Sequence, residues 1–310
     1  MKAVFMNQHG GPDVLMFGEM PDPVARPGEV VVDIAAASVN GADWKVRTGQ
    51  SHPVSQFPYI LGRDFSGMIA AVGDGVVDLR PGDAVFGVCD VGQEGAYAEK
   101  IAVKAAIVAR KPDTISHPQA AAMALTGLTA LVSVEDTLVL KAGETILIQG
   151  GAGGVASFAI QLARSIGARV ITTTSAANRD YVQALGPDEI IDYNAVDFTK
   201  VAPACDAVFD TVGGDVAQRS FAVLKPGGRA AFIASGTQPP KPPRNDVRSL
   251  RPAVKRDRAH LERIAELVRT GAVRPPAIKL CPLADAPTAH RVSESRHFRG
   301  KLVFAVRGET

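Results

Sequence analysis

Two hydrophobic patterns divide the chain and predict two kinds of domain. In the first third, short apolar runs such as KAVFM and GEVVVDIAAASVN are separated by Pro-Gly and glycine-rich turns, which is typical of a mostly β domain. Further on, the runs TILIQ, RVITT, EIID, DAVFD and RAAFI alternate with helical stretches, which predicts a doubly wound parallel sheet. We therefore expect an α/β protein with a β domain over residues 1–120, a parallel-sheet domain over 121–271, and a strand-rich tail, 272–310, that returns to the first domain.

The stretch TILIQGGAGGVASFAIQLARSIG, residues 145–167, predicts a buried strand, a glycine turn and an amphipathic helix that stops at Gly167. Within the turn, Gly151, Gly153 and Ala156 fit the pattern G-x-G-x-x-G/A, in which bare backbone N–H groups at a helix N-terminus face a pyrophosphate. The position between a strand and a helix favours a dinucleotide site over glycines that merely allow a tight turn.

The next strand indicates which dinucleotide is bound. Enzymes that use NAD usually carry an acidic residue about 20 positions past the first glycine, but no Asp or Glu occurs between Gly151 and Arg179. Instead the strand is followed by Ser175, Asn178 and Arg179, whose hydroxyl, amide and guanidinium groups suit a 2′-phosphate. The sequence therefore favours NADP(H), although Ser175 and Asn178 are also typical caps of the helix that follows.

Composition and charge exclude several classes of protein. The 310 residues are 46% hydrophobic and 21% charged with a net charge of +2, so we expect a globular protein with no nucleic-acid partner. Three widely spaced cysteines, Cys89, Cys205 and Cys281, argue for a reducing compartment. The uncharged stretch 114–134 contains Pro, His, Gln and Gly and predicts a buried helix rather than a membrane span, and the N-terminus does not resemble a signal peptide. A cytoplasmic protein without membrane contact is expected.

Several motifs together resemble a known family, the medium-chain dehydrogenase/reductase superfamily, and within it the zinc-independent quinone oxidoreductase, or zeta-crystallin-like, branch. The resemblance covers nearly the whole chain and implies a GroES-like mostly β domain followed by a Rossmann domain. One departure is Ala156, where this branch more often has a third glycine. The motifs are Ser38-Val39-Asn40, PYILGRDFSG (58–67), Pro81-Gly82-Asp83, LTGLT (125–129), GGAGGV (150–155), Lys225-Pro226-Gly227-Gly228 and Arg299-Gly300-Lys301-Leu302-Val303.

The resemblance also implies that no metal takes part. Zinc-dependent relatives have a Cys where this chain has Asn40 and a His near Arg63, and their structural zinc needs four cysteines where this chain has Cys89 alone. The histidines show no ligand spacing and are expected to be solvated or hydrogen-bonded; they are His9, His52, His117, His260, His290 and His297.

Without a metal, hydrogen-bond donors must stabilise the oxygen of a quinone or an α,β-unsaturated carbonyl that accepts hydride. The candidates are Asn40, Tyr59 and Asp43; the other interpretations are a turn-capping carboxylate for Asp43 and a packed aromatic for Tyr59. The resemblance implies that the cofactor is lined by Asn40, Thr126, Gly151, Gly153, Gly154, Val155, Ser175, Asn178, Arg179, Tyr193, Thr211, Val212, Gly213, Ile233, Phe298 and Gly300.

We therefore expect an NADPH-dependent reductase of quinones or enones that forms a homodimer. Two alternatives stay open: an enoyl-thioester reductase on the same scaffold and a non-catalytic NADPH-binding protein. The segment 241–258 carries seven Lys or Arg against two Asp. It is either a basic flap over an anionic substrate or cofactor phosphate, or a solvated loop that leads into a helix.

Overall fold

The computed structural model of the chain describes residues 1–51, 54, 56–234, 236, 238–296 and 298–307. These residues pack into two compact units. Unit 1 comprises Met1–Leu125, Arg256–Arg269 and Pro275–Thr310, and unit 2 comprises Thr126–Lys255 and Thr270–Arg274. The helix α2 (His117–Leu131) begins in unit 1 and ends in unit 2.

Unit 1 is built from two sheets. The larger one has the spatial order β15 (Ile278–Pro282), β16 (Lys301–Ala305), β3 (Glu29–Ser38), β5 (Asp64–Val72), β6 (Ala84–Val88) and β8 (Val108–Arg110), with β7 (Lys100–Lys104) paired to β3. The smaller one has the order β2 (Met16–Glu19), β1 (Lys2–Met6) and β4 (Tyr59–Ile60). The strand β16, near the C-terminus, pairs antiparallel with β3, so residues from both ends of the chain form one sheet.

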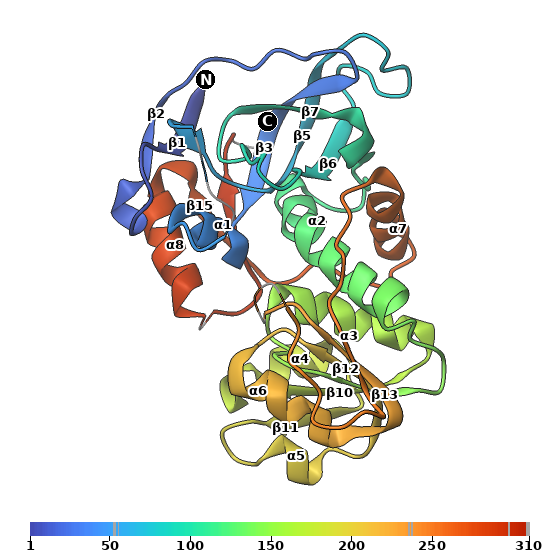
Figure 1. Cartoon of the computed structure of the whole chain (residues 1–310). Helices are drawn as coiled ribbons and strands as arrows, with labels where there is room; N and C mark the ends of the chain where they lie inside the picture. Colours follow the sequence, from blue (N-terminus) through green and yellow to red (C-terminus); the bar gives the residue numbers. More distant parts are fainter. Residues whose placement is uncertain (52–53, 55, 235, 237, 297, 308–310) are drawn as a thin grey trace. The chain divides into compact units, whose positions relative to one another are not determined.

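The strand β3 lies in the middle of the larger sheet, and its position explains its apolar sequence. Val30, Val32 and Ile34 are fully buried in the core of unit 1, together with Phe65 of β5 and Phe304 of β16. The remaining segments of unit 1 are η1 (Pro12–Val14), α1 (Gly41–Arg47), η2 (Ala105–Ile107), α7 (Arg258–Arg269), η6 (Leu283–Asp285) and α8 (Ala286–Ser295). In Figure 1, α1 and α8 lie on one side of the unit 1 strands, next to each other.

Unit 2 contains a six-stranded sheet in which every pairing is parallel. Its order is β11 (Glu189–Asp192), β10 (Arg169–Thr174), β9 (Thr145–Ile148), β12 (Cys205–Asp210), β13 (Leu224–Phe232) and β14 (Arg248–Leu250). The chain runs outward from β9 in one direction and returns to run outward from β12 in the other. The order therefore reverses between β9 and β12, and such a reversal is where open parallel sheets bind ligands, at the carboxyl ends of the strands.

Short helices accompany these strands in unit 2 (Figure 1). They are η3 (Val132–Thr137), α3 (Gly154–Ile166), η4 (Ala176–Asn178), α4 (Arg179–Ala184), α5 (Phe198–Val201), α6 (Gly214–Arg219) and η5 (Ser220–Val223). The helix α3 packs against β9 and β10, and Phe158, Ala159 and Leu162 are among its buried residues. It ends at Gly167, which is left-handed with φ 89°. The predicted strand, turn and helix are therefore present with these boundaries.

The helix α7 differs from the sequence-based expectation. Residues 121–271 were expected to form one parallel-sheet domain, but Arg256–Arg269 belongs to unit 1, where α7 packs against β8 and η2. Arg258 holds it there, because Nε donates to the carbonyl of Val108 at 2.8 Å and Nη2 to that of Ala105 at 2.6 Å. Helical periodicity identifies the apolar face of α7 but does not say which sheet that face covers.

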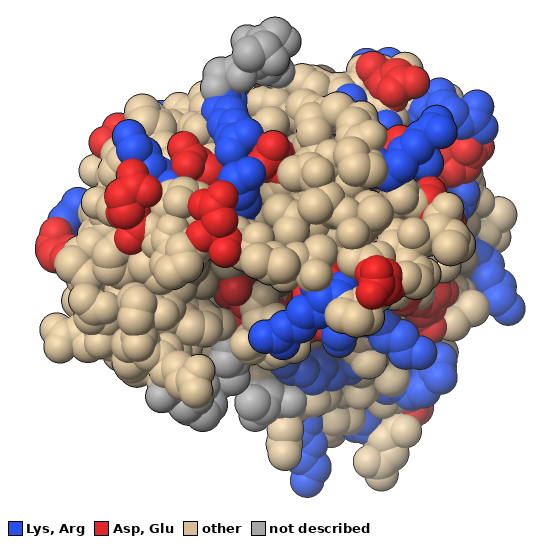
Figure 2. Space-filling model, turned by 90° about the horizontal axis from the view of Figure 1, so that it is seen from above, with Lys and Arg blue, Asp and Glu red and all other residues tan. Residues whose placement is uncertain are grey.

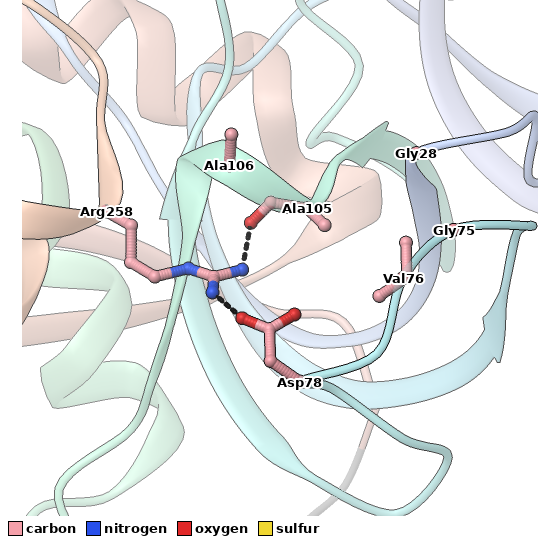
Figure 3. Close-up of a pocket in the computed structure, with 7 residues that line it drawn as sticks. All are labelled: Gly28, Gly75, Val76, Asp78, Ala105, Ala106 and Arg258. Atoms are coloured by element: carbon pink, nitrogen blue, oxygen red, sulfur yellow. Dashed lines mark hydrogen bonds and ion pairs between the residues drawn. The ribbon is translucent and has the colours of Figure 1, made fainter.

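A shallow pocket of about 440 Å³ lies at this attachment point (Figure 3). The same Arg258 guanidinium that donates to Ala105 also forms an ion pair with Asp78 across the pocket. Gly28, Gly75, Val76 and Ala106 complete the lining. Arg258, the cation of this pocket, is therefore already bound by protein groups, and it attaches α7 to β8 and η2.

Charged side chains of both signs are interspersed on the face of the molecule that Figure 2 shows, with uncharged areas between them. This distribution agrees with the small net charge of +2. Within the part of the chain that the structure describes, no helix is both long and apolar enough to span a membrane.

Candidate active site

The glycine turn, residues 150–154, connects β9 to α3 and packs tightly against β10. Gly150 has a φ of +77°, and the N–H of Gly151 donates to the carbonyl of Thr173 at 2.8 Å. A Cβ on Gly151 would lie 2.5 Å from Thr172 Oγ1, so a larger residue would have to displace the Thr172 side chain. By contrast, a Cβ on Gly153 would lie 3.4 Å from its nearest neighbour, so the protein itself leaves space beside that position.

The N-terminus of α3 is prepared for an anion. Its N-cap is Gly153, which makes no side-chain capping bond, and the first turn carries no acidic residue. Gly154 and Val155 open the helix. The positive end of the helix dipole therefore has no carboxylate of its own to neutralise it, and the groups present fit a phosphate.

The carboxyl end of β10 leads directly to the residues that were expected to contact a 2′-phosphate. Ser175 and Asn178 are half-buried, their side chains are joined by a hydrogen bond of 3.3 Å, and Arg179 is exposed. Ser175 and Asn178 occupy the N-cap positions of η4 and α4, but neither makes a side-chain capping hydrogen bond. Tyr193, which is 53% exposed, donates its backbone N–H to the carbonyl of Thr174 and so lies beside the same strand end.

The turn after β12 lies against the glycine turn. Thr211 Oγ1 donates to the carbonyl of Gln149 at 2.7 Å, and a Cβ on Gly150 would lie 2.9 Å from Thr211 Oγ1 and 3.1 Å from Val212 Cγ2. Asp210 shapes this turn, because its carboxylate accepts from the N–H groups of Val212 and Gly213.

The backbone of Ile233 donates to the carbonyl of Asp210 and brings the end of β13 to the same place. Unit 2 therefore gathers most of the predicted cofactor residues at the carboxyl ends of its strands. The exception in this unit is Thr126, which is buried within α2.

In unit 1, Asn40 lies at the centre of a buried group that we call the Asn40 cluster: Ser38, Asn40, Asp43, Asp64 and Lys301. Asn40 Nδ2 donates to Asp64 Oδ1 at 3.0 Å and to the carbonyl of Ser38 at 3.3 Å. Asn40 Oδ1 accepts from Lys301 Nζ at 2.7 Å. Both ends of the amide are therefore already bound, and Asn40 is 8% exposed, so the expected donation from this side chain to a substrate oxygen is not supported by its geometry.

Asp43 is fully buried and serves as the N3 residue of α1. Its Oδ2 accepts from the N–H of Asn40 at 2.8 Å and from Tyr97 Oη at 2.8 Å, while Oδ1 is enclosed without a hydrogen-bond partner in the described residues. The capping interpretation therefore describes Asp43 well, and direct contact with a substrate does not. Burial raises the pKa of Asp43 to about 7, which the positive charge of Arg63 opposes.

Tyr59 is half-buried, and its hydroxyl donates to Oε2 of Glu94. Burial and this carboxylate raise the pKa of Tyr59 well above its ordinary value, so the phenol is a weak acid in this state. The other carboxylate oxygen, Oε1, lies 3.0 Å from Nη2 of Arg63. Tyr59 is therefore part of a charged group rather than only a packed aromatic.

The last two predicted cofactor residues lie in unit 1 and have packing roles. Phe298 packs against the core of the unit. Gly300 has a φ of +69°, and a Cβ there would lie 2.0 Å from the carbonyl oxygen of Ala277. These contacts explain the residue types without a cofactor.

Asp64 and Lys301 belong to the candidate site, although sequence reasoning did not select them. Both are fully enclosed, and Asp64 also accepts from the hydroxyl of Ser38 at 2.9 Å. Burial raises the pKa of Asp64 and lowers that of Lys301, and each charge opposes the shift of the other. Each residue stands at the start of a strand-forming run, but nothing local shows that the two meet.

The described histidines, cysteines and carboxylates do not form a metal site. Among the side chains that the structure describes, no group of three or more His, Cys, Asp and Glu is arranged to hold a metal ion. His290 is buried, its Nδ1 accepts from Arg47 Nη1 at 2.9 Å, and its Nε2 lies 3.3 Å from Tyr97 Oη. His117 Nδ1 lies 2.8 Å from Ser66 Oγ. His52 and His297 lie outside the described residues.

Comparison with known proteins identifies the family. Residues 26–113 match the alcohol dehydrogenase GroES-like domain, and residues 185–304 match the zinc-binding dehydrogenase family. Among curated proteins, the chain is 30% identical to the NADPH-dependent alkenal/one oxidoreductase, chloroplastic, of Arabidopsis thaliana, over 98% of this chain and 79% of that protein.

Two solved structures have the same fold along their whole length. One is the quinone oxidoreductase from Coxiella burnetii, with 33% identity, a TM-score of 0.89 and coverage of 99% of both chains. The other is the Escherichia coli quinone oxidoreductase complexed with NADPH, with 26% identity, a TM-score of 0.89 and coverage of 99% of this chain and 100% of the other. The chain therefore belongs to the medium-chain dehydrogenase/reductase superfamily, among its quinone oxidoreductases and alkenal reductases.

Proposed function

We propose that this protein is an NADPH-dependent oxidoreductase that reduces a quinone or an α,β-unsaturated carbonyl. The observation that carries the proposal is the site at the carboxyl ends of β9, β10 and β12. There the glycine turn and the uncapped N-terminus of α3 follow β9, and Ser175, Asn178 and Arg179 follow the adjacent strand β10. The names of the relatives, which include an enzyme complexed with NADPH and an alkenal/one oxidoreductase, support the same activity.

The residues of unit 2 fit NADP(H) part by part. The pyrophosphate fits the glycine turn and the first turn of α3, whose N–H groups supply the donors. The 2′-phosphate fits Ser175, Asn178 and Arg179, since three donor groups with one positive charge stand where an NAD site has a carboxylate. We assign Tyr193, Thr211, Val212, Gly213 and Ile233 to the flanks of the same site.

In unit 1, the residues around Asn40 act by positioning. When bound, NADPH supplies a hydride, and the acceptor takes up one further proton to give the hydroquinone or the saturated ketone. Lys301 binds the oxygen of the Asn40 amide and Asp64 binds its nitrogen, so this side chain is held in one orientation. Asp43 fixes the backbone at the start of α1. Rate enhancement then comes mainly from holding the acceptor against the hydride donor.

We further propose that turnover requires no metal. The ammonium group of Lys301 lies 2.7 Å from Asn40 Oδ1, so a buried cation already occupies the neighbourhood of Asn40. A second cation there would be repelled by it. Retention of full activity after exhaustive chelation supports this; stoichiometric zinc whose removal abolishes turnover contradicts it.

The activity is tested by following NADPH oxidation with a panel of simple quinones, enones and enoyl thioesters. Turnover of a quinone or an enone is the expected result. Turnover of enoyl thioesters alone would mean that the acceptor is an enoyl thioester and not a quinone or an enone. Tight NADPH binding without any turnover would indicate a binding protein.

We also propose that the protein is a homodimer and is located in the cytoplasm. The strand β14 is at the edge of the unit 2 sheet, and an unpaired edge offers backbone groups to a second copy. All three cysteines are free, as expected in a reducing compartment. Light scattering combined with size-exclusion chromatography measures the assembly, and a mass of one chain would contradict it.

A further inference from the structure

Arg63 has more hydrogen-bonding capacity than the protein uses. It lies in the link between β4 and β5 and is 7% exposed. Nη2 pairs with Glu94 at 3.0 Å, but the enclosed Nε has no hydrogen-bond partner among the described residues. A buried donor left unpaired costs free energy, so its retention calls for an explanation such as a ligand.

A second guanidinium lies nearby, on Arg256. Burial and the positive charge of Arg63 both lower the pKa of Arg256, so the two cations repel each other. Glu94 is fully buried and already shared between Arg63 and the Tyr59 hydroxyl. Among the carboxylates that attract Arg256, Asp90 has the largest effect, and it is paired with Lys104 at 2.9 Å. An anion placed beside the two guanidinium groups would relieve this repulsion.

This group adjoins the Asn40 cluster. Asp64, the residue after Arg63, binds the Asn40 amide at 3.0 Å, and the charge of Arg63 acts directly on Asp43. Tyr59, whose hydroxyl binds Glu94, is only half-buried, so the group has a partly exposed member. A molecule held against Asn40 would therefore have its remaining atoms close to Arg63.

We propose that Arg63, oriented by Glu94 and supported by the charge of Arg256, binds a carboxylate carried by the acceptor substrate. The inference rests on the proposed reductase function and narrows its substrate class to acidic enones or quinones. Arginine suits the task because its planar fork matches a carboxylate and it stays charged when buried. The competing explanation is that the ion pair only ties the loop around Glu94 to the β4–β5 link.

The test uses a matched pair of acceptors, trans-β-acetylacrylate and its methyl ester, which share one enone and differ in one negative charge. We expect the wild type to show a kcat/KM about tenfold higher for the acid than for the ester. Arg63→Met should lower kcat/KM for the acid by about tenfold to hundredfold, mainly through KM, and change the ester by less than about threefold. Arg80→Met, at an exposed arginine in the same unit, is the control and should change neither.

Two further measurements keep the inference testable if Arg63→Met folds poorly. Arg256→Met should reduce the preference for the acid without removing it, and added salt should weaken the wild-type preference. Equal kcat/KM values for acid and ester in the wild type, or equal losses for both in Arg63→Met, would overturn the carboxylate site. Failure to reduce either acceptor or any quinone would instead contradict the proposed reductase activity.

Discussion

The glycine turn of unit 2 and the Asn40 cluster of unit 1 are built in opposite ways. The turn uses backbone groups within a few residues of one another and depends on the absence of side chains. The Asn40 cluster uses buried side chains from distant segments, since Asn40 and Lys301 are 261 positions apart in the sequence. A backbone site tolerates changes that keep space free, whereas a buried charged cluster depends on every partner.

The largest expected effect concerns the buried ammonium group. Lys301→Met would leave the carboxylate of Asp64 and the amide oxygen of Asn40 without their cation, and should lower the free energy of unfolding by about 3–5 kcal/mol. Lys104→Met removes a half-exposed lysine from a surface pair and should cost at most about 1 kcal/mol. Denaturant unfolding of both variants measures the difference, and similar losses would mean that the cluster contributes no special stability.

The pH dependence of stability tests the same cluster through Asp43. Burial raises its pKa to about 7 from 3.8, so between about pH 4 and pH 7 the folded protein retains a proton that the unfolded chain has lost. The contribution of Asp43 to the free energy of unfolding should therefore fall as pH rises through this window, by up to about 1.4 kcal/mol per pH unit.

Asp43→Asn imitates the protonated form and should remove this slope, so that the variant matches the wild type near pH 4 and exceeds it near pH 7. Asp33→Asn, at a partly exposed surface pair with Lys100, is the control and should keep the slope. Parallel stability curves for the wild type and Asp43→Asn would show that Asp43 does not titrate in this range.

Two alanine substitutions in the glycine turn should separate folding from cofactor binding. The Cβ of Gly151→Ala would lie 2.5 Å from Thr172 Oγ1 and should cost about 1–3 kcal/mol of stability. The Cβ of Gly153→Ala meets no atom closer than 3.4 Å, so stability should hold while NADPH binding weakens, because the space at that position serves the phosphate. Thermal melting measures the stability of both variants, and a titration measures their affinity for NADPH. Unchanged NADPH affinity in Gly153→Ala would show that the phosphate does not bind beside Gly153.

The same contrast explains what the sequence could predict. The segment from Thr145 to Gly167 carries its strand, turn and helix signals locally, and α3 and β9 are present as predicted. The roles of Asn40 and Tyr59 depend on Lys301 and Glu94, which no local pattern connects to them. Asp64 could not be selected from the sequence because its charged and polar partners are distant along the chain. The position of α7 could not be predicted because it depends on carbonyl groups of β8 and η2 that accept from Arg258.

A binding titration with NADPH and NADH shows whether unit 2 binds NADPH through donors at the end of β10. The wild type should bind NADPH at least about tenfold more tightly than NADH. Arg179→Ala should weaken NADPH binding by about 1–3 kcal/mol and leave NADH nearly unchanged. Arg169→Ala, at the opposite end of β10, should change neither. Equal affinities of the wild type for NADPH and NADH, or equal effects of the two arginine variants, would show that the end of β10 does not bind the 2′-phosphate.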